Sequence, residues 1–304
     1  MKVLVTGSSG LVGTALVPAL ARDGHTVCRL IRPESIAKDR AKEGPDVAWN
    51  PATGELGSAA VVMDAVVNLA GASIAGGRWS AKRKDVLRSS RVDTTRALVA
   101  ALTKMNARPK VLVSASAIGY YGDRADEELT EESASGSDFL AGLCREWEAE
   151  ALKAEALGIR VVLARIGIVL AREGGALPKM ILPFRMFMGG KIGSGKQWMS
   201  WISMEDLVGV LRYAIENRAI RGVLNVVAPK PKRNAEFTKM LAQAMHRPAL
   251  FPAPAFALRL ALGEMADALL LSSQHVIPSR LQQLGYKFLH ADLSNALGAV
   301  LKAE

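Results

Sequence analysis

Short apolar runs, several of them β-branched, recur along the first half of the chain, and segments of helical period lie between several of them. Parallel strands need long crossover connections, so this alternation is typical of a parallel sheet that is buried on both faces. The expected fold class is therefore α/β, with a doubly wound parallel sheet of the Rossmann type. The runs that predict strands are residues 3–5, 26–31, 65–69, 110–114 and 160–165.

The second half of the chain loses this alternation. Long helices are predicted over about residues 80–103 and 139–156, and a last strand over 222–227 ends at Pro229. Beyond Pro229 the chain is helical and rich in Met, Leu and Ala, whereas the glycine-rich residues 189–195 predict a loop. We expect a Rossmann domain of residues 1–168 plus 196–228, and a smaller, mostly helical C-terminal substrate lobe of residues 169–195 and 229–304.

Composition excludes several classes of protein. The 304 residues are 50% apolar and 22% charged, which excludes disordered and fibrous chains. Two cysteines, Cys28 and Cys144, cannot build a disulfide framework, and the four histidines show no ligand spacing, so we expect no metal site. The chain starts on a strand pattern rather than an export signal, and its most apolar stretch, 251–271, carries three charged residues. We therefore expect a cytoplasmic protein without a transmembrane segment.

The charge balance is strongly basic, with 39 Lys and Arg against 29 Asp and Glu, a net charge of +10. Such a surplus fits nucleic acid, an acidic membrane surface or a small phosphorylated ligand. No recognised nucleic-acid motif accompanies the charge, so an interpretation as a nucleic-acid binder rests on the charge alone. The charge alone does not distinguish these three classes of partner, whereas the sequence motifs do.

A glycine-rich turn follows the first predicted strand and opens a helix near Leu11. Gly7, Gly10 and Gly13 form a G-x-x-G-x-x-G spacing directly after Thr6. A dinucleotide needs glycines where the turn takes unusual dihedral angles, where the backbone approaches the pyrophosphate and where the helix packs on the strand. The position in a βαβ unit favours dinucleotide binding over the alternative of a tight structural turn without a ligand.

The end of the second predicted strand selects the cofactor. A protein specific for NAD usually carries an acidic residue there, which binds the ribose 2′-hydroxyl. Here the strand ends in Ile31 and Arg32. A cation at Arg32 suits the 2′-phosphate of NADP, and the alternative is a solvated arginine at a strand end.

The chain resembles the short-chain dehydrogenase/reductase superfamily in its extended, epimerase-like form. Besides the glycine turn, the residues that carry this resemblance are 67–71, 113–116, 120–122 and 201–207. More closely, the chain is similar to an atypical subgroup with its own C-terminal domain, usually labelled "epimerase family". The stretches characteristic of this subgroup are residues 78–79, 90–96, 138–140, 147–148, 182–184, 192–195, 247–248 and 281–288.

The resemblance implies a set of cofactor contacts. One of them, Arg91, stands where the superfamily often has an asparagine, and from there a guanidinium could reach the cofactor phosphates or an anionic substrate. The positions that the resemblance assigns to NADP are Gly7, Gly10, Leu11, Val12, Gly13, Ile31, Arg32, Leu69, Ala70, Arg91 and Val169.

The catalytic groups depart from the superfamily pattern. Active members use a tyrosine and a lysine four residues apart, but none of the four tyrosines has a lysine at that spacing. When the helix is aligned through Glu148, the two positions become Leu140 and Cys144. The remaining candidates, in addition to Ser114, are Ser116, which could bind a substrate oxygen, and Tyr120 and Tyr121, which could supply a proton. The alternative for these residues is a strand-end hydroxyl and rings packed under a loop.

Two functions stay open at this point. The first is an NADP-dependent oxidoreductase, epimerase or dehydratase that acts on a hydroxylated or carbonyl substrate, for which a nucleotide sugar is one candidate. The second is a non-catalytic NADP-binding or redox-sensing protein, favoured by the missing Tyr-x-x-x-Lys pair. We expect a small-molecule substrate as the partner, neither nucleic acid nor a membrane, and most of the surplus charge on solvated surface. The oligomeric state is left open.

Overall fold

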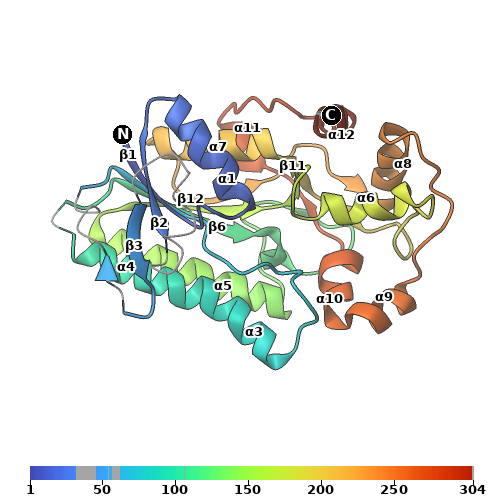
Figure 1. The fold of residues 1–304 in the computed structure, drawn as a ribbon, viewed down its shortest axis with the longest axis horizontal. Coiled ribbons are helices and arrows are strands. Elements are labelled where there is room, and N and C mark those ends of the chain that lie inside the picture. Colours follow the sequence, from blue (N-terminus) through green and yellow to red (C-terminus); the bar gives the residue numbers. More distant parts are fainter. Residues whose placement is uncertain (32–45, 54, 57–61, 106, 303–304) are drawn as a thin grey trace.

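The centre of the molecule is one parallel sheet, in agreement with the predicted fold class (Figure 1). The computed structural model describes residues 1–31, 46–53, 55–56, 62–105 and 107–302. Seven parallel strands stand in the order β12-β8-β6-β5-β1-β2-β3, and β4 pairs antiparallel at the β3 edge. The strands are β1 (Lys2–Thr6), β2 (Thr26–Ile31), β3 (Asp46–Asn50), β4 (Glu55–Leu56), β5 (Ala65–Asn68), β6 (Val111–Ala117), β8 (Arg160–Ile166) and β12 (Gly222–Val226).

Helices cover both faces of this sheet, because alternate residues of its strands point to opposite sides. Val3 and Val5 of β1 face α1 (Leu11–Arg22) and α7 (Met204–Glu216), in a core that includes Leu16 and Leu211. Leu4, between them in sequence, faces the second core, to which α4 (Thr94–Thr103) contributes Leu98 and Leu102. Each of these seven leucines and valines is fully buried, so the doubly wound arrangement follows from the apolar strand pattern.

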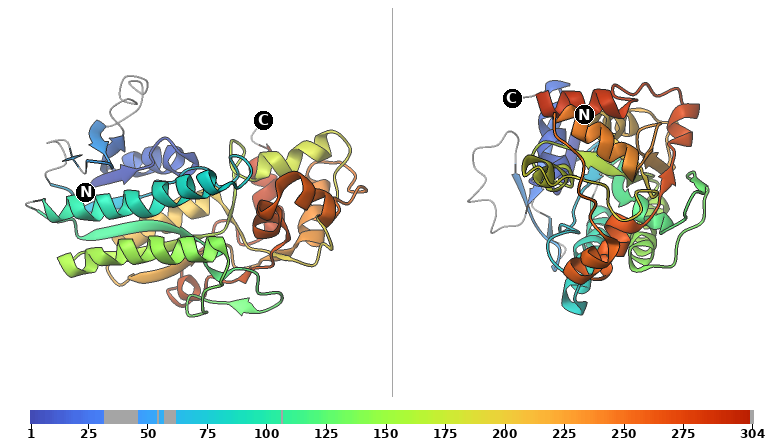
Figure 2. Two further views of the ribbon diagram at one scale, coloured as in Figure 1. Left: turned by 90° about the horizontal axis from the view of Figure 1, so that it is seen from below. Right: turned by 90° about the vertical axis from the view of Figure 1, so that its right-hand side faces the viewer.

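The two long predicted helices are confirmed, and both contain irregular turns. The first consists of α3 (Ala81–Arg88), a π turn (Ser89–Asp93) and α4. The second is α5 (Phe139–Leu152), extended by a 3-10 turn up to Gly158, whose φ of +77° ends it. Asp138 caps α5 by accepting a hydrogen bond from the Ala141 N–H at 2.8 Å. The α3–α4 helix and α5 lie side by side across one face of the sheet (Figure 2).

The C-terminal part of the chain is mostly helical and lies at one end of the sheet (Figure 1). Its separate core surrounds the fully buried Trp201. We call the helices there the helical lobe: α6 (Leu177–Arg185), α8 (Asn234–Ala244), α9 (Ala255–Leu262), α10 (Glu264–Ala266), the following π turn (Asp267–Leu271) and α12 (Leu293–Lys302). Three small sheets join the lobe to the rest: β9 (Ile168–Leu170) with β11 (Trp201–Ser203), β10 (Trp198–Met199) with β13 (Lys232–Arg233), and β14 (His275–Val276) with β7 (Glu128–Leu129).

Asp206, at the start of α7, ties the end of the chain to the sheet. The Ser203 hydroxyl accepts a hydrogen bond from the Asp206 N–H, while the Asp206 carboxylate accepts the backbone N–H groups of Leu289 at 2.7 Å and His290 at 2.9 Å. This carboxylate therefore has a structural role. In the described part of the chain, no helix is long and apolar enough to cross a membrane.

Candidate functional site

The predicted cofactor residues gather at the carboxyl edge of the sheet. All strands from β12 to β3 are parallel, so their carboxyl ends share one edge, and ligands of such sheets bind where the strand order reverses. Here the chain runs from β1 outward to β2 and β3 and then returns on the other side of β1 as β5. Gly7 after β1 and Leu69 after β5 lie at this switch point, where the Leu69 N–H donates to the Thr6 carbonyl at 3.2 Å.

The glycine turn leaves no space for side chains at two of its three glycines. Gly7 has a φ of +66°, and a Cβ at this position would lie 2.5 Å from the Leu69 carbonyl oxygen. A Cβ at Gly13 would lie 2.3 Å from the Gly7 carbonyl oxygen and 2.6 Å from Ser8 Cα. Because these neighbours are backbone atoms, they cannot rotate away. The sequence therefore needs glycine at Gly7 and Gly13 for the turn itself.

The first turn of α1 offers free backbone donors. Gly10 is the N-cap residue and provides no side-chain cap, and the first turn carries no acidic residue. Its N–H groups, including those of Leu11 and Val12, therefore form a partial positive charge of the kind that binds pyrophosphate. Leu11 and Val12 are half-buried and Gly10 is exposed, so the helix start is open to a ligand. These residues fit a dinucleotide.

Arg91 lies in the π turn between α3 and α4 and points towards the end of β5. Its guanidinium donates to the carbonyl oxygens of Ala72 at 3.0 Å and Leu87 at 3.2 Å, and it lies over the Trp147 ring at 5.4 Å. A Cβ on Gly71 would lie 3.1 Å from the Arg91 guanidinium carbon. Burial lowers the pKa of Arg91 from its ordinary value. A partly desolvated cation thus stands beside the loop that follows β5.

The other predicted cofactor residues occupy the same edge, with one outside the described residues. Ile31 is buried at the end of β2, and Leu69 and Ala70 are half-buried after β5. Val169 belongs to β9, and its carbonyl oxygen and the Leu11 side chain both approach Gly175. Arg32 lies outside the residues that the structure describes.

The candidate catalytic residues meet a buried ion pair at the end of β6. The Ser116 hydroxyl donates to Glu148 Oε1 at 2.6 Å. Arg165 of β8 binds the same carboxylate through two bonds of 2.8 Å, from Nε to Oε1 and from Nη2 to Oε2. Burial opposes the charged form of Arg165, but its hydrogen bonds and attraction to Glu148 raise the pKa of the guanidinium. The pair fixes Ser116 as a hydrogen-bond donor to a carboxylate.

The two adjacent tyrosines have different surroundings. Tyr121 is fully buried; its hydroxyl accepts from Arg165 Nη1 at 3.0 Å and donates to Asn225 Oδ1 at 2.7 Å. Burial raises the pKa of Tyr121 to about 12, so this hydroxyl keeps its proton at neutral pH. Tyr120 is half-buried, and the Arg165 guanidinium carbon lies 3.3 Å from the centre of its ring. Arg165 therefore contacts both tyrosines.

Apolar contacts occupy the positions that the superfamily gives to its tyrosine and lysine. Leu140 is buried and contacts Gly119, where a Cβ would lie 3.3 Å from Leu140 Cβ. The Cys144 thiol is buried 3.7 Å from the Ala117 carbonyl oxygen. Burial, reinforced by the charge of Glu148, raises the pKa of Cys144 to about 12, so the thiol stays neutral. Neither group can exchange a proton in the way the usual pair does.

A cavity of about 310 Å³ lies between α5 and the helical lobe. Its apolar walls include Trp79 and Phe139, whose rings make an edge contact at 5.3 Å, and Leu140. These residues share an apolar cluster with Leu69, so the cavity adjoins the carboxyl edge of the sheet. The charged residues of its lining are four carboxylates and one arginine: Asp123, Asp138, Glu264, Asp267 and Arg259.

Two of these carboxylates are ion-paired and the other two accept backbone N–H groups. Glu264 binds Lys84 of α3 at 2.5 Å, and Asp267 binds Arg259 of α9 at 2.9 Å. Asp138 caps α5, and Asp123 accepts the Ser273 N–H at 3.0 Å. The cavity thus has a negative charge balance even though the whole chain is basic.

Comparison with known proteins assigns the fold to a family. The model of the NAD dependent epimerase/dehydratase family matches residues 3–226, nearly the whole sheet and the carboxyl edge described above. The chain belongs to this family. A domain of unknown function, DUF1731, matches residues 253–300, which include α9, α10 and α12.

Individual members of the epimerase family are similar over the whole chain. An epimerase family protein of Mycobacterium leprae is 42% identical over 97% of this chain and 94% of its own length. The crystal structure of human epimerase family protein SDR39U1, with NADPH, has a TM-score of 0.89 and 36% identity and covers 100% of both chains. UDP-glucuronic acid 4-epimerase from Bacillus cereus, with UDP-glucuronic acid and NAD, has a TM-score of 0.78 at 17% identity, with 98% of this chain and 97% of that chain covered. The last likeness shows the fold alone.

Within this epimerase/dehydratase fold, sequence reasoning missed the buried pair of Glu148 and Arg165. From the sequence, Glu148 is expected only to align α5 and to belong to the characteristic stretch 147–148, and Arg165 only to end a strand. One signal was available, since an arginine that ends the apolar run 160–165 needs a partner if the strand is buried. Asn225, whose side-chain oxygen accepts the hydrogen bond from the Tyr121 hydroxyl, stands in a similar position on β12.

Proposed function

We propose that this protein is an NADP(H)-dependent oxidoreductase of the epimerase/dehydratase family that acts on a neutral hydroxylated or carbonyl compound. The observation that carries the proposal is the turn from Gly7 to Gly13, where the backbone is bare and the first turn of α1 is uncapped. The similarity to SDR39U1, whose structure contains NADPH, supports the choice of cofactor. Residues 1–168 and 196–228 bind the cofactor, and residues 169–195 and 229–304 complete the substrate site.

Each part of the cofactor has residues suited to it. The N–H groups of the first turn of α1 bind the pyrophosphate, and Arg32 pairs with the 2′-phosphate. Leu69, Ala70 and Val169 border the nicotinamide end. Bound NADPH would supply a hydride for the reduction of a carbonyl carbon.

The charge of the cavity bears on the substrate. Its carboxylates would repel a diphosphate group at close range. The interaction energy of two unit charges about 4 Å apart is several kcal/mol in a partly buried site. We therefore favour a neutral hydroxylated or carbonyl compound over a nucleotide sugar inside this cavity. Trp79, Phe139 and Leu140 supply apolar contact area for such a compound.

The binding experiment that tests the proposal compares NADPH with NADH by isothermal titration calorimetry. NADPH is expected to bind on the order of ten- to a hundredfold tighter, since charge-assisted hydrogen bonds to the 2′-phosphate contribute about 1.5–3 kcal/mol. Oxidation of NADPH is then followed against panels of carbonyl compounds and nucleotide sugars. Equal affinities, or tighter binding of NADH, would contradict the choice of cofactor.

Arg91→Ala is expected to weaken NADPH binding by about ten- to a hundredfold, because one charged donor beside the cofactor is lost. Arg88→Ala is the matched control: Arg88 lies three residues earlier, is half exposed and pairs with Glu146 on the surface at 2.6 Å. Its affinity for NADPH should equal that of the unmodified protein. Unchanged affinity in Arg91→Ala, measured by the same calorimetry, would remove Arg91 from the cofactor site.

Tyr120 is the proton donor in this proposal, and Ser116 and Tyr121 are positioning residues. The hydroxyls of Ser116 and Tyr121 already donate to Glu148 and Asn225, whereas the ring of Tyr120 rests on the Arg165 cation. This contact places a cation beside the half-buried Tyr120 side chain. The roles of the missing tyrosine and lysine thus pass to Tyr120 and Arg165.

Tyr120→Phe should lower kcat by about a hundredfold or more on the compound that the panel identifies, since general acid catalysis contributes about 10²–10⁴. NADPH affinity should stay unchanged in this variant. Tyr213→Phe is the control, because Tyr213 packs against Tyr286 at 5.4 Å in another part of the chain. A Tyr120→Phe protein with full kcat would exclude Tyr120 as the proton donor.

A second function has one observation in its favour. Leu140 and Cys144 put buried, neutral groups at the two positions that the superfamily uses for proton transfer. A non-catalytic NADP-binding or redox-sensing protein would need no proton donor there. Tight NADPH binding without turnover on any compound of the panel would favour this alternative.

A further inference from the structure

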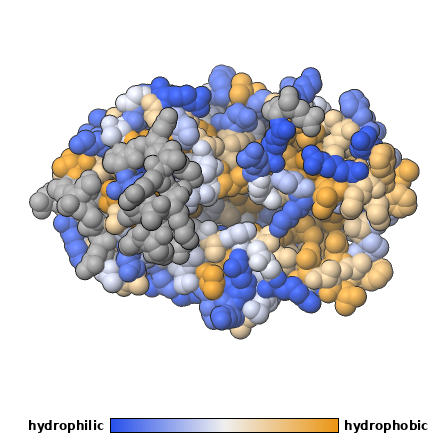
Figure 3. All heavy atoms as spheres, in the orientation of Figure 1, coloured by the Kyte–Doolittle hydropathy of each residue, from blue (hydrophilic) through white to orange (hydrophobic). Residues whose placement is uncertain are grey.

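The outer end of the helical lobe exposes large apolar side chains. They come from the C-terminal part of α6, the segment after it, and the segment 249–253, and they are 55–72% exposed. The two segments are joined by backbone hydrogen bonds, from the Phe251 N–H to the Gly189 carbonyl at 3.0 Å and from the Ala253 N–H to the Lys191 carbonyl at 2.8 Å. We call these residues the apolar tip: Leu182, Met186, Phe187, Met188, Leu250 and Phe251. The space-filling view shows hydrophobic residues gathered at this end of the molecule (Figure 3).

The same part of the chain carries an unbalanced positive charge. Residues 177–199 and 237–262 contain no aspartate or glutamate. They contain seven lysines and arginines, at positions Lys179, Arg185, Lys191, Lys196, Lys239, Arg247 and Arg259. Of these, only Arg259 forms an ion pair with a carboxylate of the described residues. Positive charge and exposed apolar surface therefore coincide.

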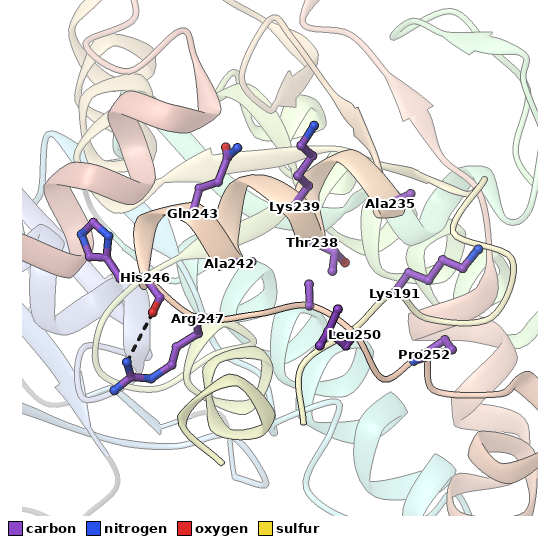
Figure 4. A pocket seen from close by; sticks show the side chains of 11 residues that line it. Lys191, Ala235, Thr238, Lys239, Ala242, Gln243, His246, Arg247, Leu250 and Pro252 are labelled. Atoms are coloured by element: carbon purple, nitrogen blue, oxygen red, sulfur yellow. Dashed lines mark hydrogen bonds between the residues drawn. The ribbon is translucent and has the colours of Figure 1, made fainter. Parts of the chain in front are cut away.

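The groove beside the tip shows how the cations are arranged. A cavity of about 910 Å³ lies between α8 and residues 247–252, with Ala242, Leu250 and Pro252 in its lining. In the close-up, Lys239, Lys191 and Arg247 point away from one another and not towards a common centre (Figure 4). Such an arrangement suits many separate negative charges spread over a surface better than one phosphate group.

The backbone at the tip is held in an unfavourable conformation. Three non-glycine residues of the described chain have a positive φ, and two of them are Phe187 at 60° and His246 at 52°. The left-handed region is unfavourable for bulky residues, because their side chain crowds the following carbonyl oxygen. The Phe187 residue is also 55% exposed. The guanidinium carbon of Arg247 lies 4.7 Å from the centre of its ring. An exposed phenylalanine in such a position is not explained by packing within the chain.

We propose that the apolar tip inserts into the headgroup region of an anionic lipid bilayer, with the surrounding lysines and arginines on the lipid phosphates. Apolar side chains flanked by cations give interfacial binding without a membrane span, and each cation near an anionic surface contributes about 1 kcal/mol. A second copy of the chain is a poor occupant, because its own tip would place cations against cations. Nucleic acid would match the charge but would leave Phe187, Leu250 and Phe251 in water.

The test is co-sedimentation of the NADPH-loaded protein with two kinds of vesicle, phosphatidylcholine alone and phosphatidylcholine mixed with phosphatidylglycerol. The protein should sediment with the anionic vesicles and stay largely in solution with the neutral ones. Raising the salt concentration should weaken this binding, since screening shortens the range of the attraction. Equal binding to both vesicles, or binding to neither, would overturn the proposal.

Variants separate the apolar and the charged contributions. The double variant Leu250→Ser/Phe251→Ser should lose binding to anionic vesicles, and Arg185→Gln/Lys239→Gln should weaken it about twentyfold or more, as two cations are removed. Leu289→Ser is the matched control, because Leu289 is a leucine 70% exposed outside the tip. It should bind as the unmodified protein does.

Two further outcomes would contradict insertion of the tip into a bilayer. If Leu250→Ser/Phe251→Ser binds anionic vesicles as well as Leu289→Ser does, the contact is purely electrostatic and the tip does not insert. If the protein is a dimer by sedimentation velocity and this double variant is a monomer, the tip contacts a second copy. NADPH affinity, measured in each variant, establishes that the fold is intact.

Discussion

Arg165→Met is expected to lower the free energy of unfolding by about 3–5 kcal/mol, because it leaves the Glu148 carboxylate buried without its cation. Glu148 is 6% exposed and Arg165 is 3% exposed, so water cannot replace the lost partner. The variant also removes the donor to Tyr121 and the cation under Tyr120. Denaturation in urea, followed by circular dichroism, measures the change.

Two other variants serve as comparisons for the stability of Arg165→Met. Arg88→Met breaks an exposed pair with Glu146, and such pairs are worth about 1 kcal/mol or less. The double variant Arg165→Met/Glu148→Met removes both charges, and we expect it to be more stable than Arg165→Met alone, since no unpaired charge stays buried. If Arg165→Met has the same free energy of unfolding as Arg88→Met, the buried pair contributes no more to stability than an exposed pair does.

Gly13→Ala is expected to abolish NADPH binding at cofactor concentrations that saturate the unmodified protein, a loss of about a hundredfold or more. The new Cβ would lie 2.3 Å from the Gly7 carbonyl oxygen, so the turn has to open, and overpacking of this kind costs about 1–3 kcal/mol. The donors of the first turn of α1 then no longer face the pyrophosphate. Calorimetric titration with NADPH gives the affinity.

Gly298→Ala is the control for this variant, because Gly298 also lies in a helix, α12, and a Cβ there would meet nothing within 4 Å. Alanine is the better helix former, so Gly298→Ala should be at least as stable as the unmodified protein and bind NADPH equally well. If Gly13→Ala binds NADPH like Gly298→Ala, the cofactor does not use the glycine turn.

The fold could be predicted from the sequence because its signals are local. The apolar runs and the helical period place β1, β2, β5, β6, β8 and β12 within a few residues of the expected ranges. A π turn inside the predicted helix 80–103 could not be foreseen, since a single extra residue hardly changes the average period. The strand β3 was missed, because the alternation that predicts the other elements is weak around it.

The candidate site depends on contacts between distant residues, and those were only partly predictable. The glycine spacing leads directly to the cofactor turn, because dihedral angles and backbone approach are local requirements. The adjacent tyrosines Tyr120 and Tyr121 cannot be told apart by sequence, since the difference between them comes from Arg165 and Asn225 on other strands. From the sequence we also expect no membrane partner; the tip argues otherwise only once the exposure of Phe187 and Leu250 is known.

The π turn lets the long helix carry one residue more than a regular helix of the same rotation. Because such a turn absorbs the extra residue, deleting one residue between Ser89 and Asp93 would leave a regular helix and rotate the part after it by far less than the roughly 100° of one α-helical residue. Thr95 would keep its hydrogen bonds with Asn68 at 2.8 Å and Trp147 at 3.0 Å, and Leu98 would stay in the core. The irregular turn thus gives Arg91 a place in the helix without rotating the half that packs on the sheet.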